Sequence, residues 1–380
     1  MTEIGLYVHV PFCRSRCTYC DFATSVGLDD LRPRYVKAVC REIASLRPGL
    51  SLATVYFGGG TPSLLSTAQL AAVLETASRR ATLAADAEIT LEANPGDLDA
   101  AALRGLRAVG VNRLSIGVQS FDDAQLRSIG RRHDSARAVE SLGLARSVGF
   151  ANVSLDLIFG LPGQSEGSWR QTLDRAANLA PEHLSLYCLT LEAGTPLANA
   201  VARGDVTVPD DDGAAGMYES ARDRLDSAYE HYEISNWARR DASRDLRARH
   251  NLRYWQTKPY VGVGAAAHSC FGGRRYHNVN SPSDYVERIE SGRNGVEDAD
   301  TEEITPEIAV ADVLMLGLRL TSGVSREEYR ARFGVDLAAG HAAAIERLSG
   351  FGLVELTPDR LRLTPRGQLL GNEVFQSFLP

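Results

Sequence analysis

Three cysteines lie within eight residues near the start of the chain, at Cys13, Cys17 and Cys20 in the stretch YVHVPFCRSRCTYCDF. A [4Fe-4S] cluster normally takes four cysteine thiolates, so three thiolates leave one iron free to bind a small molecule. A zinc ion would instead need a fourth ligand, such as a distant histidine, and packing cysteines would need no metal. Phe22 stands two residues after Cys20, so no fourth thiol follows there. The C-x3-C-x2-C spacing after an apolar strand favours the cluster.

A second motif, FGGGTP, contains Gly59, Gly60 and Thr61 and follows another apolar segment. Backbone amides and carbonyls that no side chain shields can hold the ammonium and carboxylate of an amino-acid ligand, although a plain glycine turn is the alternative. Glu92, at the end of ITLE, could accept hydrogen bonds from such a ligand or could be a solvated carboxylate. If FGGGTP and Glu92 lie beside an iron with an open position, they predict a site for the ligand of that iron.

Short apolar segments alternate with amphipathic helical segments over the first half of the chain. Such strand–helix–strand units form right-handed parallel βαβ units, and strands this apolar are buried on both faces. Six units are too few for a closed eight-stranded barrel, so the pattern predicts an incomplete, TIM-like (βα)6 barrel of the α/β class, with an open doubly wound sheet as the alternative. The expected strands are 5–10, 52–57, 88–93, 113–118, 152–159 and 183–189.

The unusual residues stand at or just after the ends of successive expected strands. The cysteines follow the first strand and the glycines follow the second. Glu92 ends the third, Gln119 ends the fourth, and Asp156 lies in the fifth. Because the carboxyl ends of parallel strands gather around one mouth, where sites are built, these motifs are expected to meet there. This convergence favours the barrel.

The pattern changes after about residue 205, and we expect three regions. Residues 1–205 form the barrel, and residues 206–300 cap it and contain HNLRYW at 250–255. Residues 301–380 form a C-terminal extension of helices and a hairpin that resembles a winged helix, within LVELTPDRLRLTPRG.

The composition is that of a soluble globular protein, with 44% hydrophobic and 23% charged residues. A formal net charge of -7 gives no reason to expect a nucleic-acid partner. No apolar run approaches membrane-spanning length, and MTEIGLYVHV lacks the basic flank and cleavage site of a secretory signal. Six cysteines are too sparse for a disulfide framework. We therefore expect a cytoplasmic protein with reduced thiols and no integral membrane segment.

Several stretches together resemble the radical S-adenosylmethionine superfamily, in its oxygen-independent coproporphyrinogen oxidase branch. They are YVHVPFCRSRCTYCDF, YFGGGTPSLL, EITLEANPGDL, GVNRLSIGVQSFDD, SLDLIFGLPGQ and YEISNWA. Within that branch, HNLRYW resembles the H-N-x-x-Y-W element of the haem chaperones. The coproporphyrinogen enzymes typically read C-x3-C-x2-C-x-C and carry an N-terminal arm. Here Phe22 replaces the last cysteine and the first strand begins almost at Met1, and both departures count against decarboxylase activity.

The resemblance implies a role for each matching residue. The ligands of a [4Fe-4S] cluster would be Cys13, Cys17 and Cys20. The residues that face S-adenosyl-L-methionine would be Tyr7, Tyr19, Gly59, Gly60, Thr61 and Glu92. A further pocket, for a second S-adenosylmethionine or another ligand, would be lined by Gln119, Arg131 and Asp156.

His250 of HNLRYW is the candidate contact with haem, because imidazole is a common axial ligand of haem iron. Tyr254 and Trp255 could pack on a porphyrin face. The alternative is a packing element in which His250 is only hydrogen-bonded. We expect His9 to be a hydrogen-bonded histidine of the barrel core and Cys188 to be an ordinary buried thiol.

These features favour a haem chaperone that passes haem to an unidentified acceptor protein and receives electrons from an unidentified donor. The alternative is an oxygen-independent coproporphyrinogen III dehydrogenase, which would oxidatively decarboxylate propionate groups. A third possibility is a radical enzyme with an unrelated substrate, which would bind no haem.

Overall fold

A mixed sheet of 12 strands forms the larger part of the computed structural model, which describes residues 1–379. Its order is β14-β13-β12-β11-β1-β4-β5-β6-β7-β8-β10-β9. The strands are β1 Thr2–Val10, β4 Leu50–Gly59, β5 Thr82–Ala93, β6 Arg113–Gln119, β7 Val153–Phe159, β8 His183–Cys188, β9 Tyr229–Glu233, β10 Asn236–Arg239, β11 Tyr260–Val263, β12 His268–Phe271, β13 Arg274–His277 and β14 Glu302–Glu303.

The six expected strands are β1, β4, β5, β6, β7 and β8, and they lie in the sheet in chain order, each parallel to the next. Right-handed crossovers that always step in the same direction leave the helices on one outer side of a curved sheet. A doubly wound sheet would reverse its strand order. The expectation of an incomplete barrel is therefore confirmed, and the doubly wound alternative is wrong.

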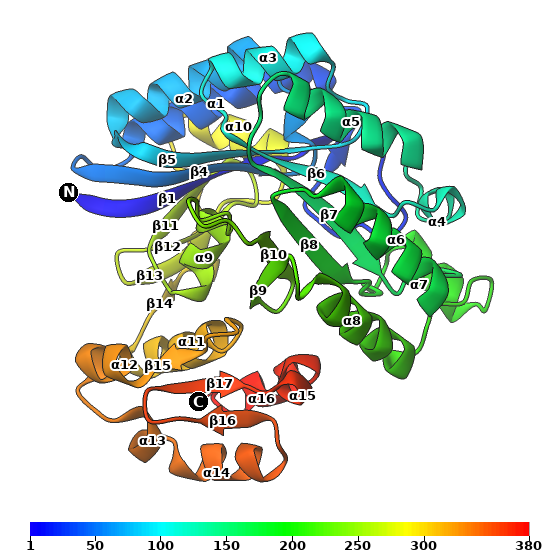
Figure 1. Ribbon diagram of the computed structural model, residues 1–380. Coiled ribbons are helices and arrows are strands. Elements are labelled where there is room, and N and C mark those ends of the chain that lie inside the picture. The colour runs from blue at the N-terminus through cyan, green and yellow to red at the C-terminus, as the bar shows by residue number, and fades with distance from the viewer. Residues whose placement is uncertain (380) are drawn as a thin grey trace.

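The helices between these strands cover the outside of the sheet (Figure 1). They are α1 Arg32–Ser45, α2 Thr67–Arg80, α3 Ala100–Ala108, α4 Asp123–Ser128, α5 Ser135–Ser147 and α6 Glu166–Leu179. Five of them begin at a residue whose side chain accepts a hydrogen bond from a backbone amide of the first turn, namely Ser66, Asp99, Asp122, Asp134 and Ser165. Such caps fix where each strand-to-helix loop ends and so limit how far the site loops extend.

Two edges of the sheet were not foreseen. β11 joins the free side of β1 in parallel register, with Gly5 opposite Tyr260. On the other side, β10 and β9 form a hairpin that pairs antiparallel with β8. β11 has only four residues, too short a pattern to be recognised before its partner strand is known.

The HNLRYW motif forms α9, Arg249–Trp255, which packs against β4 below the mouth of the barrel. Glu88 of β5 accepts hydrogen bonds from the backbone amides of Arg249 and His250, at 3.1 and 3.0 Å. The buried guanidinium of Arg253 contacts Glu3 at 2.8 Å. These contacts tie α9 to the first three parallel strands.

The remaining elements complete the barrel edge and the C-terminal part, which lies below the barrel in Figure 1. A second hydrophobic core there includes Leu314, Leu361 and Val374, and the expected hairpin is present as β16 and β17. Residues 1–205 and 206–300 share one larger core. The elements are β2 Phe12–Cys13, β3 Ser25–Val26, η1 Asp29–Leu31, η2 Pro62–Leu64, α7 Pro196–Ala202, α8 Asp211–Leu225, α10 Pro282–Glu290, η3 Asp298–Asp300, α11 Pro306–Gly317, β15 Val324–Ser325, α12 Arg326–Phe333, α13 Leu337–Gly340, α14 Ala342–Gly350, β16 Val354–Leu356, β17 Arg360–Leu363, α15 Pro365–Leu369 and α16 Gly371–Gln376.

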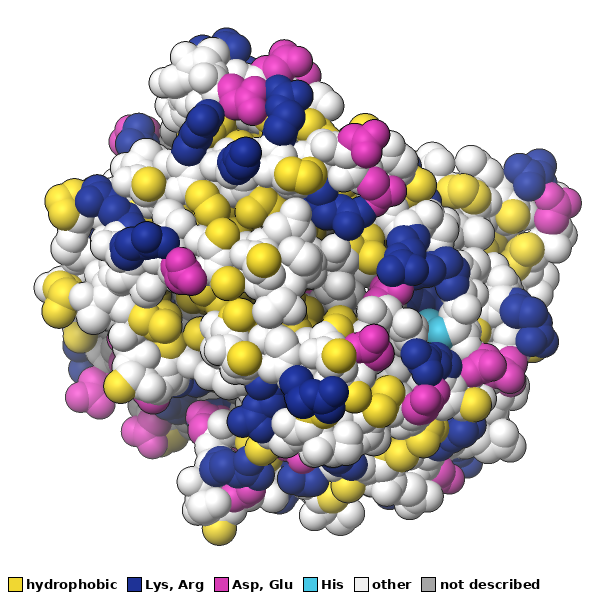
Figure 2. Space-filling view, turned by 90° about the horizontal axis from the view of Figure 1, so that it is seen from above, with side chains coloured by type: hydrophobic (Ala, Val, Ile, Leu, Met, Phe, Trp, Pro, Cys, Tyr) yellow, Lys and Arg dark blue, Asp and Glu magenta, His cyan; other side chains and the backbone are white. Residues whose placement is uncertain are grey.

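Basic and acidic side chains are interspersed on the face seen from above, over the outer helices (Figure 2). Among residues 1–379, every helix is too short or too polar to cross a bilayer.

Candidate functional site

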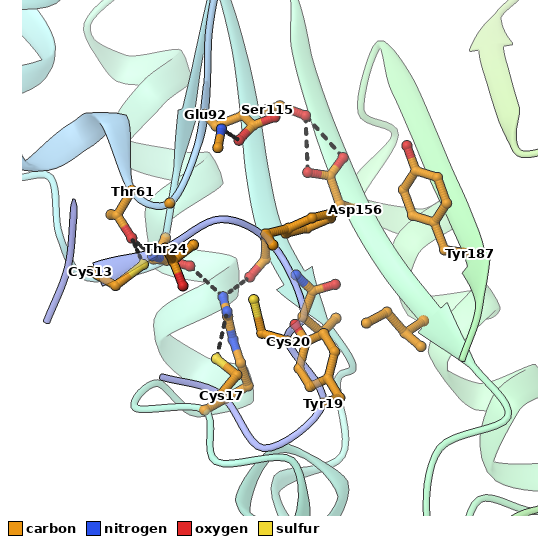
Figure 3. Close-up of a pocket in the computed structure, with 18 of the residues that line it drawn as sticks. Cys13, Cys17, Tyr19, Cys20, Thr24, Thr61, Glu92, Ser115, Asp156 and Tyr187 are labelled. Carbon is orange, nitrogen blue, oxygen red and sulfur yellow. Dashed lines mark hydrogen bonds between the residues drawn. The ribbon is translucent and has the colours of Figure 1, made fainter. Parts of the chain in front are cut away.

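One cavity of about 500 Å³ opens at the carboxyl ends of the parallel strands. All five motifs meet in it, as the strand-end rule predicts. Figure 3 shows the three cysteines on one side of the cavity and Glu92 and Asp156 on strands facing them. The lining residues predicted from the sequence are Cys13, Cys17, Tyr19, Cys20, Gly59, Gly60, Thr61, Glu92, Gln119, Arg131 and Asp156.

Backbone hydrogen bonds hold the cysteine loop together and attach it to the barrel. β2, which contains Cys13, pairs with β3 within the loop segment itself. Further along, the amide of Thr18 donates to the carbonyl of Ile129 at 3.2 Å. The ring of Tyr19 packs with Ile129 against Ile158. These contacts within the protein hold the loop over the cavity.

Polar groups of the barrel contact two of the three sulfur atoms. Cys13 Sγ lies 3.4 Å from Thr61 Oγ1, and Arg131 Nη1 donates to Cys17 Sγ at 3.6 Å. Burial raises the pKa of the Cys13 and Cys20 thiols, and the nearby cysteines raise them further. Three thiolates so close would repel one another, and iron would remove that penalty.

The loop offers three thiolates, and thiolates are the usual ligands of a [4Fe-4S] cluster. Within the described residues 1–379, Thr18 Oγ1 and Arg131 Nε are buried without a hydrogen-bond partner beside the cysteines. The residues present therefore fit a cluster at Cys13, Cys17 and Cys20.

The glycines of FGGGTP allow β4 to end directly against the cysteine loop. Gly59 has a φ of +111°, and a Cβ there would lie 2.5 Å from the His9 ring. A Cβ on Gly60 would lie 2.8 Å from the backbone of Pro11 and Phe12. The backbone of this strip therefore lines the cavity with no side chain in between, which suits a ligand's ammonium and carboxylate groups.

Glu92 is held in the cavity wall by two donors. Tyr56 OH donates to its Oε1 at 2.7 Å and the Gly59 amide donates to its Oε2 at 3.2 Å. Burial raises the pKa of Glu92 to about 7, and the negative charge of Asp156 adds to the rise. The carboxylate is thus poised to gain from a positively charged or hydroxyl-bearing ligand.

Asp156 occupies the far side of the cavity. Both of its carboxylate oxygens accept from Ser115 Oγ, at 2.9 and 3.0 Å, and burial raises its pKa. Gln119 nearby has a φ of +67°, a conformation that non-glycine residues adopt at a cost and that is often found at functional sites. Arg131 Nη2 donates to Asn94 Oδ1 and to the Gly117 carbonyl, both at 2.5 Å. Arg131 thereby joins the cysteine loop to the ends of β5 and β6.

Two predicted site residues lie behind the cavity wall. Tyr7 OH is hydrogen-bonded to His9 Nδ1 at 3.1 Å, and the Tyr7 ring stacks beside Tyr56. His250 is 1% exposed, and its ring nitrogens are hydrogen-bonded to Thr54 Oγ1 and Tyr254 OH. Burial lowers the pKa of His250 to about 3, so the imidazole is neutral. It can bind an iron only after one of these hydrogen bonds is exchanged.

Two other sequence-based predictions have clear outcomes. His9 is buried, with one nitrogen bonded to Tyr7 and the other to the Ala23 carbonyl at 2.9 Å, so its place in the barrel core is confirmed. The prediction for Cys188 is wrong, because this thiol is exposed and lines the cavity. It is the last residue of β8, where the strand leaves the core.

Sequence reasoning missed several polar side chains of the cavity wall. They alternate along the strands with apolar core residues, so a period of two marks the side of each strand that faces the barrel interior. The pattern identifies that side but does not say which polar residues reach the cavity. The missed lining residues are Tyr56, Arg113, Ser115, His183, Ser185 and Tyr187.

Comparisons with known proteins agree with this geometry. Residues 7–176 match the radical SAM superfamily and residues 304–370 match the HemN C-terminal domain. The heme chaperone HemW of Bacillus subtilis is 37% identical, over 98% of both chains. HemW of Mycobacterium tuberculosis H37Rv is also 37% identical, over 99% of this chain and 94% of that protein. The structure of the Escherichia coli coproporphyrinogen III oxidase HemN, a radical SAM enzyme, is similar with a TM-score of 0.85 and 25% identity, over 99% of this chain and 90% of HemN.

Proposed function

Because the chain belongs to the HemW family of the radical S-adenosylmethionine superfamily, we propose that it is a haem chaperone, which binds haem and transfers it to acceptor proteins. The observation that carries the proposal is similarity over nearly the whole length to proteins named for this activity, at 34–39% identity. The cavity at the strand ends supports a cluster and S-adenosylmethionine as its other ligands.

The cluster is assigned to the three-cysteine loop. Cys13, Cys17 and Cys20 would hold three of its corners, and Arg131 would offset negative charge through its contact with Cys17. When bound, the cluster and S-adenosylmethionine supply low-potential one-electron chemistry. Phe22, which is 64% exposed in the cavity wall, stands where the coproporphyrinogen enzymes have a further cysteine.

Different parts of the cavity wall would bind different parts of S-adenosylmethionine. The backbone of Gly59 and Gly60, with the Thr61 hydroxyl, would bind the methionine end. Glu92 would accept from the ammonium or a hydroxyl group. Gln119 and Asp156 would bind a part of the ligand that lies farther from the cysteines, or a second ligand. A cavity of about 500 Å³ is in the range of small-molecule sites.

Haem is assigned to His250 of α9. A neutral imidazole is the form that binds haem iron, and burial keeps His250 neutral. The hydrogen bond between His250 Nε2 and Tyr254 OH, at 2.8 Å, connects two residues of the same short helix. Iron would replace this hydrogen bond, and Tyr254 would be released to pack against the porphyrin.

Metal analysis tests the cluster. Anaerobically reconstituted protein is expected to contain about four irons per chain, the stoichiometry of one cubane cluster. Replacing Cys13, Cys17 and Cys20 together with serine removes the iron, whereas Cys40→Ser, in α1, retains it. Zinc in place of iron, or equal iron in both variants, would refute the assignment.

Haem titration tests the chaperone function. Added haem is expected to give a shifted Soret band that weakens in His250→Ala. The matched control is His231→Ala, since His231 is another internal imidazole, partly buried and stacked on Trp237 with ring centroids 4.2 Å apart. If the haem spectrum of His250→Ala equals that of the unmodified protein, haem binds at another residue. If added haem gives no shifted Soret band in the unmodified protein, haem binding is refuted.

The second candidate function is coproporphyrinogen III dehydrogenation, which the structural similarity to HemN favours. Incubation with coproporphyrinogen III, S-adenosylmethionine and a reductant is expected to give no protoporphyrinogen. Formation of protoporphyrinogen in that assay would instead support the dehydrogenase function.

A further inference from the structure

Tyr56 of β4 contacts both the cavity wall and the HNLRYW helix. Its hydroxyl donates to Glu92 Oε1 at 2.7 Å. Its ring stacks on the His250 imidazole, with centroids 5.1 Å apart and an interplanar angle of 26°. One rigid side chain therefore lies between the carboxylate assigned to S-adenosylmethionine and the imidazole assigned to haem.

The His250 ring is held by contacts on its edge and on its face. Thr54 Oγ1 is hydrogen-bonded to Nδ1 at 2.7 Å and Tyr254 OH to Nε2 at 2.8 Å. The Tyr56 ring covers one face. Because the imidazole is buried in a packed environment, it can turn toward an iron only if a neighbouring ring moves with it.

Tyr56 is in turn held by its hydroxyl. Glu92 is the hydrogen-bond acceptor of this hydroxyl, and Glu92 also lines the cavity. A ligand ammonium or hydroxyl group that donates to Oε1 of Glu92 competes with Tyr56 OH for that oxygen atom. When that hydrogen bond is weakened, the Tyr56 ring is no longer anchored at its hydroxyl end.

We infer that Tyr56 is a positioning residue that couples ligand binding at Glu92 to the release of His250, so that S-adenosylmethionine increases the affinity for haem. The inference rests on the proposed function. Coupling between two binding sites is reciprocal, so haem increases the affinity for S-adenosylmethionine by the same factor. We expect a factor of about ten, in the usual range of such couplings.

Haem titrations of the anaerobically reconstituted protein, with and without saturating S-adenosylmethionine, measure this factor. In the unmodified protein the haem dissociation constant is expected to fall about tenfold when S-adenosylmethionine is present. Tyr56→Phe keeps the ring on His250 but removes the hydroxyl. In this variant the two dissociation constants are expected to be equal within about twofold, while haem still binds.

A matched control lies elsewhere in the chain. Tyr285 OH donates to Glu42 Oε2 at 2.6 Å, and the same oxygen accepts from the Gly264 amide at 2.9 Å. This pair between α10 and α1 repeats the chemistry of Tyr56, Glu92 and the Gly59 amide. Tyr285→Phe is therefore expected to keep the tenfold difference.

The possible results separate this inference from the function on which it rests. If the unmodified protein binds both ligands but shows no coupling, or if Tyr56→Phe keeps the tenfold difference, the inference is overturned and the chaperone function stands. Weaker haem binding in the presence of S-adenosylmethionine would also overturn it. If the unmodified protein binds no haem, both proposals fall. Equilibrium dialysis of S-adenosylmethionine against each variant verifies saturation.

Discussion

Replacing Glu92 with glutamine should make the stability of the barrel less sensitive to alkaline pH. In the folded protein, burial raises the pKa of Glu92 to about 7 from the ordinary 4.5. The folded chain therefore keeps a proton that the unfolded chain releases between these values. The stability that this proton contributes is present in full below pH 4.5 and is lost as the pH rises through about 7. Glutamine resembles the protonated carboxyl group and does not ionise.

The size of the effect follows from the change in pKa. A change of one in pKa corresponds to about 1.4 kcal/mol, so the full change from 4.5 to about 7 gives an upper limit of about 3.5 kcal/mol. Because Glu92 lines an open cavity and is reached by water, screening reduces this value, and we expect about 1–2 kcal/mol. The amide can still bond to Tyr56 and accept from the Gly59 amide, so the substitution leaves the local geometry intact.

Urea unfolding at pH 5 and pH 8, followed by circular dichroism, measures the difference. Relative to the unmodified protein, Glu92→Gln is expected to gain about 1–2 kcal/mol of unfolding free energy between the two pH values. Glu75→Gln is the control, because Glu75 is an exposed carboxylate on α2 and should show no such gain. An equal difference between Glu92→Gln and the unmodified protein at both pH values would refute the reasoning, since Glu92 would then not be a carboxylate destabilised by burial.

Three further predictions concern the walls of the barrel. Gly60→Ala brings a Cβ to 2.8 Å from the Pro11 backbone and should lower the free energy of unfolding by about 1–3 kcal/mol and reduce the iron content. Thermal unfolding and metal analysis measure the two effects, and an unchanged midpoint of thermal unfolding would contradict the close packing. Tyr232→Phe removes the hydroxyl that is hydrogen-bonded to His183 Nε2 at 2.8 Å. The free energy of unfolding in urea should fall by about 1–3 kcal/mol, and an unchanged value would mean that this buried hydrogen bond is absent. Although the Cys188 thiol is exposed to the cavity, desolvation by the surrounding wall and the charge of Asp211 raise its pKa. Its alkylation by iodoacetamide, followed by mass spectrometry, should therefore still increase with pH beyond about 9, where an ordinary thiol levels off, and S-adenosylmethionine should slow it. A fast, unprotected reaction at neutral pH would be the contrary result.

The sequence alone was sufficient for the barrel and for the place where its motifs meet. Each of the six strands is a short apolar run next to a helical segment, and this local pattern determines the element. The right-handed crossover and the parallel direction then decide that Cys13, Glu92 and Asp156 stand at the same end of the sheet. These rules act over one strand and one helix at a time, so they can be applied to a sequence.

Only the tertiary structure decided which side chains touch across the barrel. The hydrogen bond between Thr54 and His250 joins residues 196 positions apart, and the stacking of Tyr56 on His250 is of similar range. The pairing of β11 with β1 and the exposure of Cys188 likewise depend on where distant segments come to rest. Such contacts are selected by the packing of the whole chain, because no local pattern specifies which of many polar residues will become neighbours.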